Sequence, residues 1–258
     1  MEKILKYPRT PHIEGSRLQA GDEDLSQLPF ESIAGRPLVV EEKVDGANVG
    51  ISFTGGELCL QSRGHFLRGG AKERDYELFK LWGAAKREEL YSLLGERYVM
   101  YGEWLYRKHR VYYNSLPHFF MEFDIFDRKE GVFLDTGSRK AILSGSSVVS
   151  APVLYSGVIS RREELLSLLT ESRFITGEHI RELVEYARGC GMDENEVLSS
   201  TDGSRLAEGL YIKLEGGGRV TDRMKYVRPS YLQTASADRW HAERIIPNKL
   251  KDGADIFA

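Results

Sequence analysis

The sequence predicts an α+β fold of antiparallel sheets with helices packed outside them. One observation is a set of short apolar or alternating stretches bounded by turn residues, which indicates strands: 38–43, 49–53, 58–61, 98–105, 118–126, 132–134, 209–214 and 219–227. A second is a set of amphipathic stretches with helical spacing: 72–95, 161–169 and 178–188. A third is that no apolar run approaches the length of a membrane span, as in an ordinary globular protein.

Turn residues predict how the first strands connect. Asp45-Gly46 and Gly55-Gly56 are tight-turn pairs, so residues 38–61 are expected to form a meander of three strands. In the aromatic stretch 118–126, strand alternation would place four side chains on one face: Phe119, Met121, Phe123 and Ile125.

The chain is long enough to bury the core of one large domain. We expect this domain over residues 1–230, beginning with an irregular segment and carrying a helical insertion at about 136–205. A short tail at 231–258 would follow it. Short helices are expected near 22–30 and 237–246.

Composition excludes several classes of protein. The net charge of −3, from 36 basic and 39 acidic residues, argues against a protein that coats nucleic acid non-specifically. The first residues do not form a signal peptide. Two distant cysteines, Cys59 and Cys190, fit a reduced chain, so we expect a cytoplasmic protein with no membrane partner.

The stretch from Glu41 to Asn48 lies where a strand gives way to a turn. Lys43 within it fits two interpretations: a nucleophile presented at the mouth of a hairpin, or an edge-strand lysine that discourages aggregation. The local pattern alone favours the second interpretation, and the rest of the chain has to decide.

Other polar clusters lie at predicted strand ends or turns, where functional groups are often presented: Ser62-Arg63-Gly64, Gly102-Glu103-Trp104, Glu208-Gly209 with Lys213, and Arg223-Met224-Lys225. Cations stabilise charge on phosphate oxygens, carboxylates hold a divalent metal, and an aromatic ring stacks on a base. The set therefore suits phosphoryl or nucleotidyl transfer. The sequence contains no glycine-rich phosphate loop, zinc-ligand spacing or serine elbow.

In this order, together with Lys43-Val44-Asp45-Gly46 and Phe123-Asp124-Ile125, the clusters resemble the motifs of the covalent nucleotidyltransferase superfamily of ATP-dependent ligases and mRNA capping enzymes. The chain is most similar to the RNA ligases related to the second ligase of bacteriophage T4, over residues 38–228. The resemblance implies an ATP-grasp-like nucleotidyltransferase domain, without a C-terminal OB-fold. It also implies an ATP-dependent RNA ligase that uses Mg²⁺ or Mn²⁺ and joins a 3′-hydroxyl to a 5′-phosphate RNA end.

The resemblance assigns the chemistry of adenylate transfer to a few residues. Lys43 would attack the α-phosphate of ATP, and Lys213 and Lys225 would neutralise that phosphate. These two lysines, with the metal, would also lower the pKa of Lys43. Glu208 would bind the metal and Asp45 a metal-bound water. Many relatives have Lys-x-Lys where this chain has Arg223-Met224-Lys225, so Arg223 or Arg228 would be the second cation.

The same resemblance assigns recognition of the nucleotide and of the RNA end to five further residues. Glu42 would read the adenine amino group, Glu103 would accept from the ribose hydroxyls, and Phe123 would stack on the base. Asn48 would lie near the reacting phosphate, and Arg63 would contact the nucleotide or the end being joined. From the residues alone, Glu42 could equally be a surface charge, Arg63 a solvated turn residue and Phe123 a core residue.

Two alternatives remain open at this point. One is a DNA ligase or a capping-type guanylyltransferase with the same lysine chemistry, and the other is a non-catalytic module that binds RNA ends. Because few residues follow Arg228, we expect RNA to be gripped by residues 7–17, the basic run 107–110, the helical insertion or a partner. An end-healing kinase or phosphatase is a reasonable partner.

Overall fold

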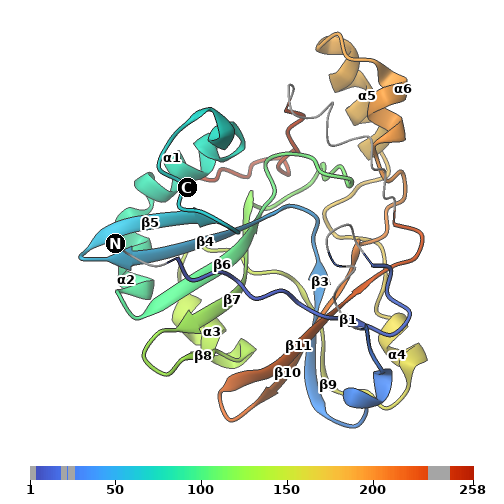
Figure 1. Ribbon diagram of the computed structural model, residues 1–258. Helices are drawn as coiled ribbons and strands as arrows, with labels where there is room; N and C mark the ends of the chain where they lie inside the picture. The colour runs from blue at the N-terminus through green and yellow to red at the C-terminus, as the bar shows by residue number, and fades with distance from the viewer. Residues whose placement is uncertain (1–3, 19–21, 23–26, 232–244) are drawn as a thin grey trace.

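The computed structural model describes residues 4–18, 22, 27–231 and 245–258. Its described part contains two mainly antiparallel sheets with helices beside them (Figure 1). The expected α+β class is confirmed.

The larger sheet has the strand order β2-β1-β11-β10-β3-β9. Its strands are β1 (His12–Ile13), β2 (Gln27–Leu28), β3 (Pro37–Lys43), β9 (Val153–Val158), β10 (Gly209–Gly216) and β11 (Arg219–Val227). β10 runs antiparallel to both β3 and β11, so Tyr211 lies between Glu41 and Lys225, and Gly209 lies beside Lys43. Glu41, Lys43 and Tyr211 therefore share one face of this sheet.

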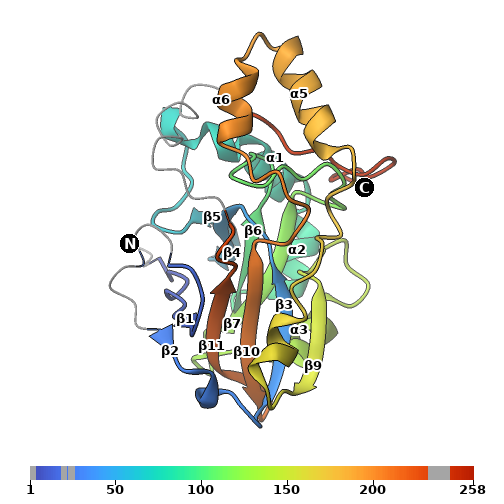
Figure 2. The same cartoon turned by 90° about the vertical axis from the view of Figure 1, so that its right-hand side faces the viewer.

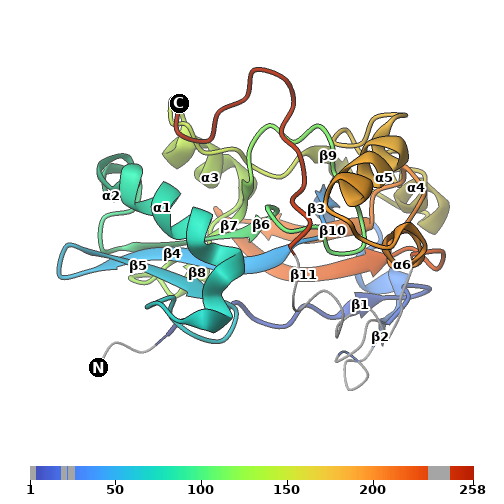
Figure 3. The same ribbon diagram turned by 90° about the horizontal axis from the view of Figure 1, so that it is seen from above.

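The smaller sheet has the strand order β5-β4-β6-β7-β8. Its strands are β4 (Ala47–Thr54), β5 (Glu57–Ser62), β6 (Tyr98–Trp104), β7 (Phe120–Asp127) and β8 (Val132–Phe133). Helices α1 (Glu77–Ala85) and α2 (Arg87–Leu94) lie along it (Figure 3). Phe79 and Trp82 of α1 are buried in one cluster with Ile51 and Phe53 of β4. The face of the smaller sheet that packs against α1 is therefore apolar.

The remaining helices lie beside one or the other sheet or at one end of the molecule (Figure 1). They are two 3₁₀ helices (Phe30–Ser32 and Ala71–Tyr76), α3 (Thr136–Leu143), α4 (Arg162–Leu166), α5 (His179–Gly189) and α6 (Glu194–Ser199). Helices α5 and α6 form a projecting pair (Figure 2), held by contacts among Leu183, Ala187 and Val197. Within the described ranges, no helix combines the length and the apolar character that a bilayer crossing demands.

The expected hairpin at Asp45-Gly46 is wrong, because β3 and β4 belong to different sheets. Gly46 is not in the left-handed conformation; a Cβ there would lie 2.7 Å from the carbonyl oxygen of Trp104. Glycine is needed at this position for close approach between backbones and not for a turn. The Gly55-Gly56 turn between β4 and β5 is confirmed, with φ angles of 59° and 76°.

Other expectations need smaller corrections. The segment 136–205 is not only helical, since it contains β9, which pairs with β3 at the edge of the larger sheet. In β7 a bulge opposite Tyr101 and Gly102 interrupts the alternation, so Met121 and Ile125 lie on opposite faces. Near 22–30 the described residues form β2 and a 3₁₀ helix, while the helix expected at 237–246 falls almost entirely outside the described residues.

The N-terminal segment crosses from one sheet to the other. The carbonyl of Leu5 accepts hydrogen bonds from Tyr101 and Gln61 of the smaller sheet, at 2.8 Å each. His12, seven residues later, pairs with Lys225 of β11. The irregular segment expected from the sequence thus places its residues along the boundary between the sheets (Figure 1).

Candidate nucleotidyltransferase site

A cavity of about 550 Å³ is lined by residues from both sheets and from the N-terminal segment. Most of the predicted site residues line it: Glu42, Lys43, Asp45, Asn48, Arg63, Glu103, Phe123, Glu208 and Lys225. Lys213 and Arg223 do not. Residues brought together from positions 42 to 225 of the chain therefore form one site.

Lys43 and Glu208 form an ion pair inside the cavity. Lys43 ends β3 and Glu208 directly precedes β10, and Lys43 Nζ lies 2.6 Å from Glu208 Oε2. On the other side of β10, the strand β11 can approach closely because residue 209 is glycine: a Cβ there would lie 1.9 Å from the carbonyl oxygen of Tyr226.

The pKa of Lys43 is raised, which corrects the expectation of a lowered value. Burial alone would lower the pKa of this ammonium group, but the carboxylates of Glu208 and Glu103 outweigh burial. The two lysines expected to lower the pKa instead pair with other carboxylates, Lys213 with Glu41 and Lys225 with Asp22. Lys43 in this state is a protonated amine.

Glu103 lies across the cavity from Lys43 and pairs with Asn48 between β6 and β4. Burial raises the pKa of Glu103 to about 8; Lys43 opposes the increase, and the carboxylates of Glu208 and Asp45 add to it. Three carboxylates thus surround a single lysine, and one of them takes up a proton near neutral pH.

Lys225 is held from the N-terminal segment by residues that sequence reasoning missed. Its Nζ contacts Asp22 Oδ2, and that carboxylate also lies 3.2 Å from His12 Nε2 and from Arg9 Nη2. Although burial opposes it, the hydrogen bond from Lys225 lowers the pKa of Asp22 to about 2. A single aspartate in an irregular segment carries no motif, so the sequence gives no signal for this contact.

Asp45 has a structural contact in addition to its predicted role at the metal. Its Oδ2 accepts hydrogen bonds from the backbone amides of Arg110 and Val111, at 2.7 and 2.9 Å. Its own amide donates to Tyr113 Oη at 2.8 Å. Asp45 therefore fixes the 105–116 loop, which brings His109 into the cavity lining.

Glu42 presents a buried oxygen that lacks a hydrogen-bond partner. Only 3% of the residue is exposed, and its Oε1 has no partner among the described residues. Burial raises the pKa of Glu42, opposed by Ser172 and Arg173. An unpaired buried acceptor is costly, so this atom suits a ligand N–H donor that enters the cavity.

Phe123 and Arg63 lie on the cavity in different settings. The ring of Phe123 is half-buried and packs edge-on against Tyr7, with 5.1 Å between ring centroids. Arg63 is exposed just beyond the end of β5. The ring can therefore receive a flat ligand, and the guanidinium group can reach a partner outside the cavity.

The donor set is compatible with a nucleotide and a divalent cation. No cluster of three metal-ligating side chains occurs in the part of the chain that the structure describes. Mg²⁺ is commonly held by only one or two carboxylates, with phosphates and waters as its other ligands. Glu208, at the cavity floor beside Lys43, is a suitable carboxylate.

The two sheets thus bring a lysine, carboxylates and an aromatic ring to one cavity. Residues 36–227, about three quarters of the chain, match the model of the RNA ligase family. The chain therefore belongs to the RNA ligase family. No curated protein sequence matches it.

Solved structures with a similar fold include variants of Naegleria gruberi RNA ligase determined with ATP and Mn. One has 16% sequence identity and a TM-score of 0.50, with 86% of this chain and 60% of that chain covered. Another has the same identity and TM-score, with coverages of 95% and 64%. The likeness establishes the fold, and this chain spans less than two thirds of the length of those ligases.

Proposed function

We propose that the protein is an ATP-dependent RNA ligase that joins 3′-hydroxyl and 5′-phosphate RNA ends through a lysyl–AMP intermediate. The observation that carries the proposal is the position of Lys43, which faces the cavity at the floor formed by Glu208 and Glu103. Membership of the RNA ligase family supports the substrate class.

In the first step the neutral amine of Lys43 attacks the α-phosphorus of ATP. An N–P bond forms, the P–O bond to pyrophosphate breaks, and the attacking nitrogen, positively charged once the N–P bond has formed, releases one proton to water. Because Glu208 holds Lys43 as an ammonium ion, the amine becomes reactive only when that pairing is relieved. Lys225 faces the cavity and stabilises the charge that builds on the phosphate oxygens.

Recognition of the adenosine falls to three other residues. The unpaired Glu42 Oε1 accepts a hydrogen bond from the adenine amino group, and Phe123 stacks on the ring. Glu103 accepts from the ribose hydroxyls. A guanine would present a carbonyl oxygen to Glu42 in place of an amino group, so this acceptor favours ATP over GTP.

Glu208, assisted by Asp45 through water, would hold Mg²⁺ or Mn²⁺. When bound, the ion supplies positive charge to the phosphate oxygens and offsets the carboxylates that surround Lys43. The Naegleria ligase structures determined with ATP and Mn support this pairing of nucleotide and metal.

The later steps transfer AMP to a 5′-phosphate and seal the bond to a 3′-hydroxyl. Arg63, an exposed residue of the cavity lining, would contact the nucleotide or the end being joined, and Asn48, on β4 in the same lining, would lie near the reacting phosphate. An end-healing kinase or phosphatase would generate these ends, and we place the reaction in the cytoplasm.

The experiment is incubation with α-labelled ATP and Mg²⁺, followed by a chase with 5′-phosphorylated RNA. We expect label on Lys43, lost in Lys43→Ala, and transfer of that label to RNA on the chase. Equal labelling of Lys43→Ala would overturn the assignment. Labelling by GTP and not ATP would identify a capping-type enzyme, transfer only to nicked DNA would identify a DNA ligase, and RNA binding without labelling would identify a non-catalytic module.

A further inference from the structure

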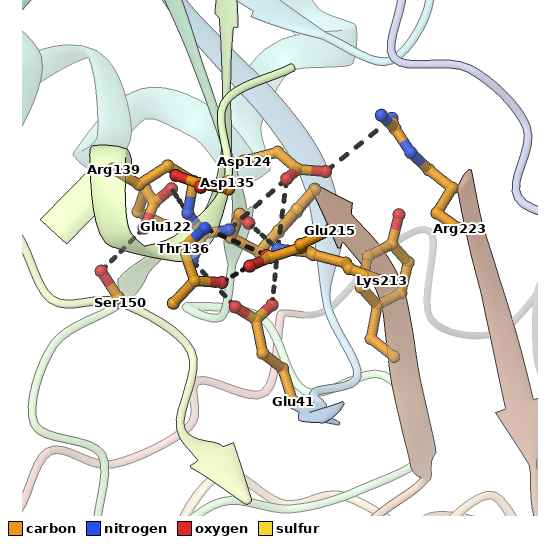
Figure 4. Close-up of polar contacts among 12 residues, drawn as sticks. Glu41, Glu122, Asp124, Asp135, Thr136, Arg139, Ser150, Lys213, Glu215 and Arg223 are labelled. Atoms are coloured by element: carbon orange, nitrogen blue, oxygen red, sulfur yellow. Dashed lines mark hydrogen bonds and ion pairs between the residues drawn. The ribbon is translucent and has the colours of Figure 1, made fainter. Parts of the chain in front are cut away.

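A charge network adjoins the cavity, which one of its members, Glu41, also lines. It consists of three acidic and three basic residues (Figure 4): Glu41, Glu122, Asp124, Arg139, Lys213 and Arg223. The charges balance, and the members come from both sheets and from α3. The network therefore joins the two sheets at a largely buried site.

Arg139 of α3 lies at the centre of the network and matches no motif in the sequence. Its Nη2 donates to Glu41 Oε1 at 2.8 Å, and its other nitrogens lie 3.4 Å from Glu122 and from Asp124. Only 1% of the residue is exposed. One guanidinium group thus spans a strand of the larger sheet and a strand of the smaller one.

Helix α3 is itself fixed so that Arg139 enters the network. Asp135 caps the helix by accepting from the amide of Ser138 at 2.8 Å. Thr136, in the first turn, donates through both its amide and its hydroxyl to Glu215 of β10. These contacts fix the first turn of α3 (Figure 4), and Arg139 lies one helical turn beyond Thr136.

Lys213 uses its donors within the network. Its Nζ lies 2.8 Å from Glu41 Oε2 and 3.1 Å from Asp124 Oδ1, and it donates to the backbone carbonyl of Phe123. Two of these contacts are ion pairs that tie Lys213 to a strand of each sheet, and the third is a hydrogen bond. Contact with a phosphate would require Lys213 to give up its ion pairs with two buried carboxylates.

The carbonyl that Lys213 holds belongs to the bulge in β7. Phe123 is the residue left without a partner opposite Tyr101 and Gly102, so ladder hydrogen bonds do not fix its backbone there. Its ring nevertheless lines the cavity, against Tyr7. Tyr7 in turn donates to Asp124, so a network carboxylate holds the second ring as well.

We propose that Lys213 and Arg139 are positioning residues for the base-binding ring, fixing the β7 bulge so that Phe123 stays exposed to the cavity. This inference rests on the proposed function, in which adenine stacks on Phe123. It assigns Lys213 to the base side of the site and leaves Lys225 as the lysine on the phosphate side.

The test separates the base from the phosphates with two probes, adenosine and inorganic tripolyphosphate, measured by calorimetry with Mg²⁺ present. Because Lys213→Met alone leaves an unbalanced buried charge, the main variants remove neutral pairs: Lys213→Met with Asp124→Asn, and Arg139→Met with Glu122→Gln. Lys225→Met is the contrasting variant, and circular dichroism reports whether each variant is folded.

Both neutral-pair variants are expected to bind adenosine roughly ten-fold more weakly, the order of loss that removal of a base–aromatic stack produces. Their affinity for tripolyphosphate should stay within about two-fold of wild type. Lys225→Met should instead lose affinity for tripolyphosphate and keep its affinity for adenosine. Tripolyphosphate binding weakened as much as adenosine binding, or adenosine binding left unchanged in the folded variants, would overturn the inference. Failure of wild-type Lys43 to label with ATP would instead overturn the proposed function.

Discussion

Lys43 and Glu208 lie 2.6 Å apart at the ends of two adjacent strands, although 164 residues separate them in the chain. The carboxylate neutralises the amine and raises its pKa. In the proposed reaction, the same pair would keep the nucleophile protonated until substrate binds and would place the carboxylate where the metal is required.

Glu208→Gln should lower the pKa of Lys43, because burial lowers it and the largest opposing carboxylate is gone. Adenylate formation should nevertheless fall by about 100-fold or more, since a charge that acts on the transition state is lost. The pKa is measured from the pH dependence of Lys43 acetylation by mass spectrometry. An acetylation profile that matches wild type would mean that Glu208 does not cause the raised pKa of Lys43.

Glu103 makes the stability of the protein depend on pH. Its folded-state pKa, about 8, lies above that of an unfolded glutamate, so the folded state keeps its proton between about pH 4.5 and 8 while the unfolded state loses it. Stability from this group is full below pH 4.5 and is lost as the pH rises to 8. The melting temperature of Glu103→Gln minus that of wild type should therefore be higher at pH 8.5 than at pH 5. Thermal melts of both proteins at the two pH values measure this difference. An equal effect of the substitution at both pH values would show that Glu103 ionises normally.

The sequence predicts every strand of the smaller sheet and the three central strands of the larger one, β3, β10 and β11, because each has its own apolar pattern, as in 49–53 and 209–214. It misassigns the link at Asp45-Gly46 because a glycine required for close approach looks the same as one required for a turn. It misses β1 and β2, which have two residues each and therefore no periodicity, and β9, which lies in the segment expected to be a helical insertion.

Site residues that belong to motifs could be found from the sequence, whereas their supporting residues could not. Asp22, which holds Lys225, and Arg139, which joins the two sheets, lie in segments without a recognisable pattern. Lys213 belongs to a motif but turns away from the cavity, since its direction depends on where Glu41 and Asp124 lie. Long-range charge pairing is a property of the folded chain, and local spacing does not encode it.

Arg139→Met should destabilise the protein by about 3–5 kcal/mol, because the three carboxylates around it lose a buried counter-charge. Combined with Glu122→Gln, the loss should be smaller, since one of those carboxylates is then neutral. Urea unfolding followed by tryptophan fluorescence measures both. Equal losses in the single and double variants would mean that the charge of Glu122 does not act on Arg139. Arg161→Met, an exposed arginine paired with Glu164, is the matched control and should leave the urea midpoint close to that of wild type.

Asn248 connects the C-terminal residues to the loop that holds Asp45. Its Oδ1 accepts from the amide of Tyr113 at 2.9 Å, and its Nδ2 donates to the carbonyl of Leu105 at 2.8 Å. Asn248→Ala leaves both buried groups unpaired, at a cost of about 1–3 kcal/mol each.

Loss of these bonds should loosen the 105–116 loop, so the Arg110 and Val111 amides that bind Asp45 should exchange faster with deuterium. Adenylate formation should fall as well, because Asp45 lies two residues from Lys43 and loses its fixed partners. Hydrogen exchange read by mass spectrometry over the loop peptides measures the first effect. Asn195→Ala, at an exposed position in α6, is the control and should leave the loop unchanged. Unaltered exchange at 110–111 in Asn248→Ala would mean that the side chain of Asn248 does not hold this part of the loop.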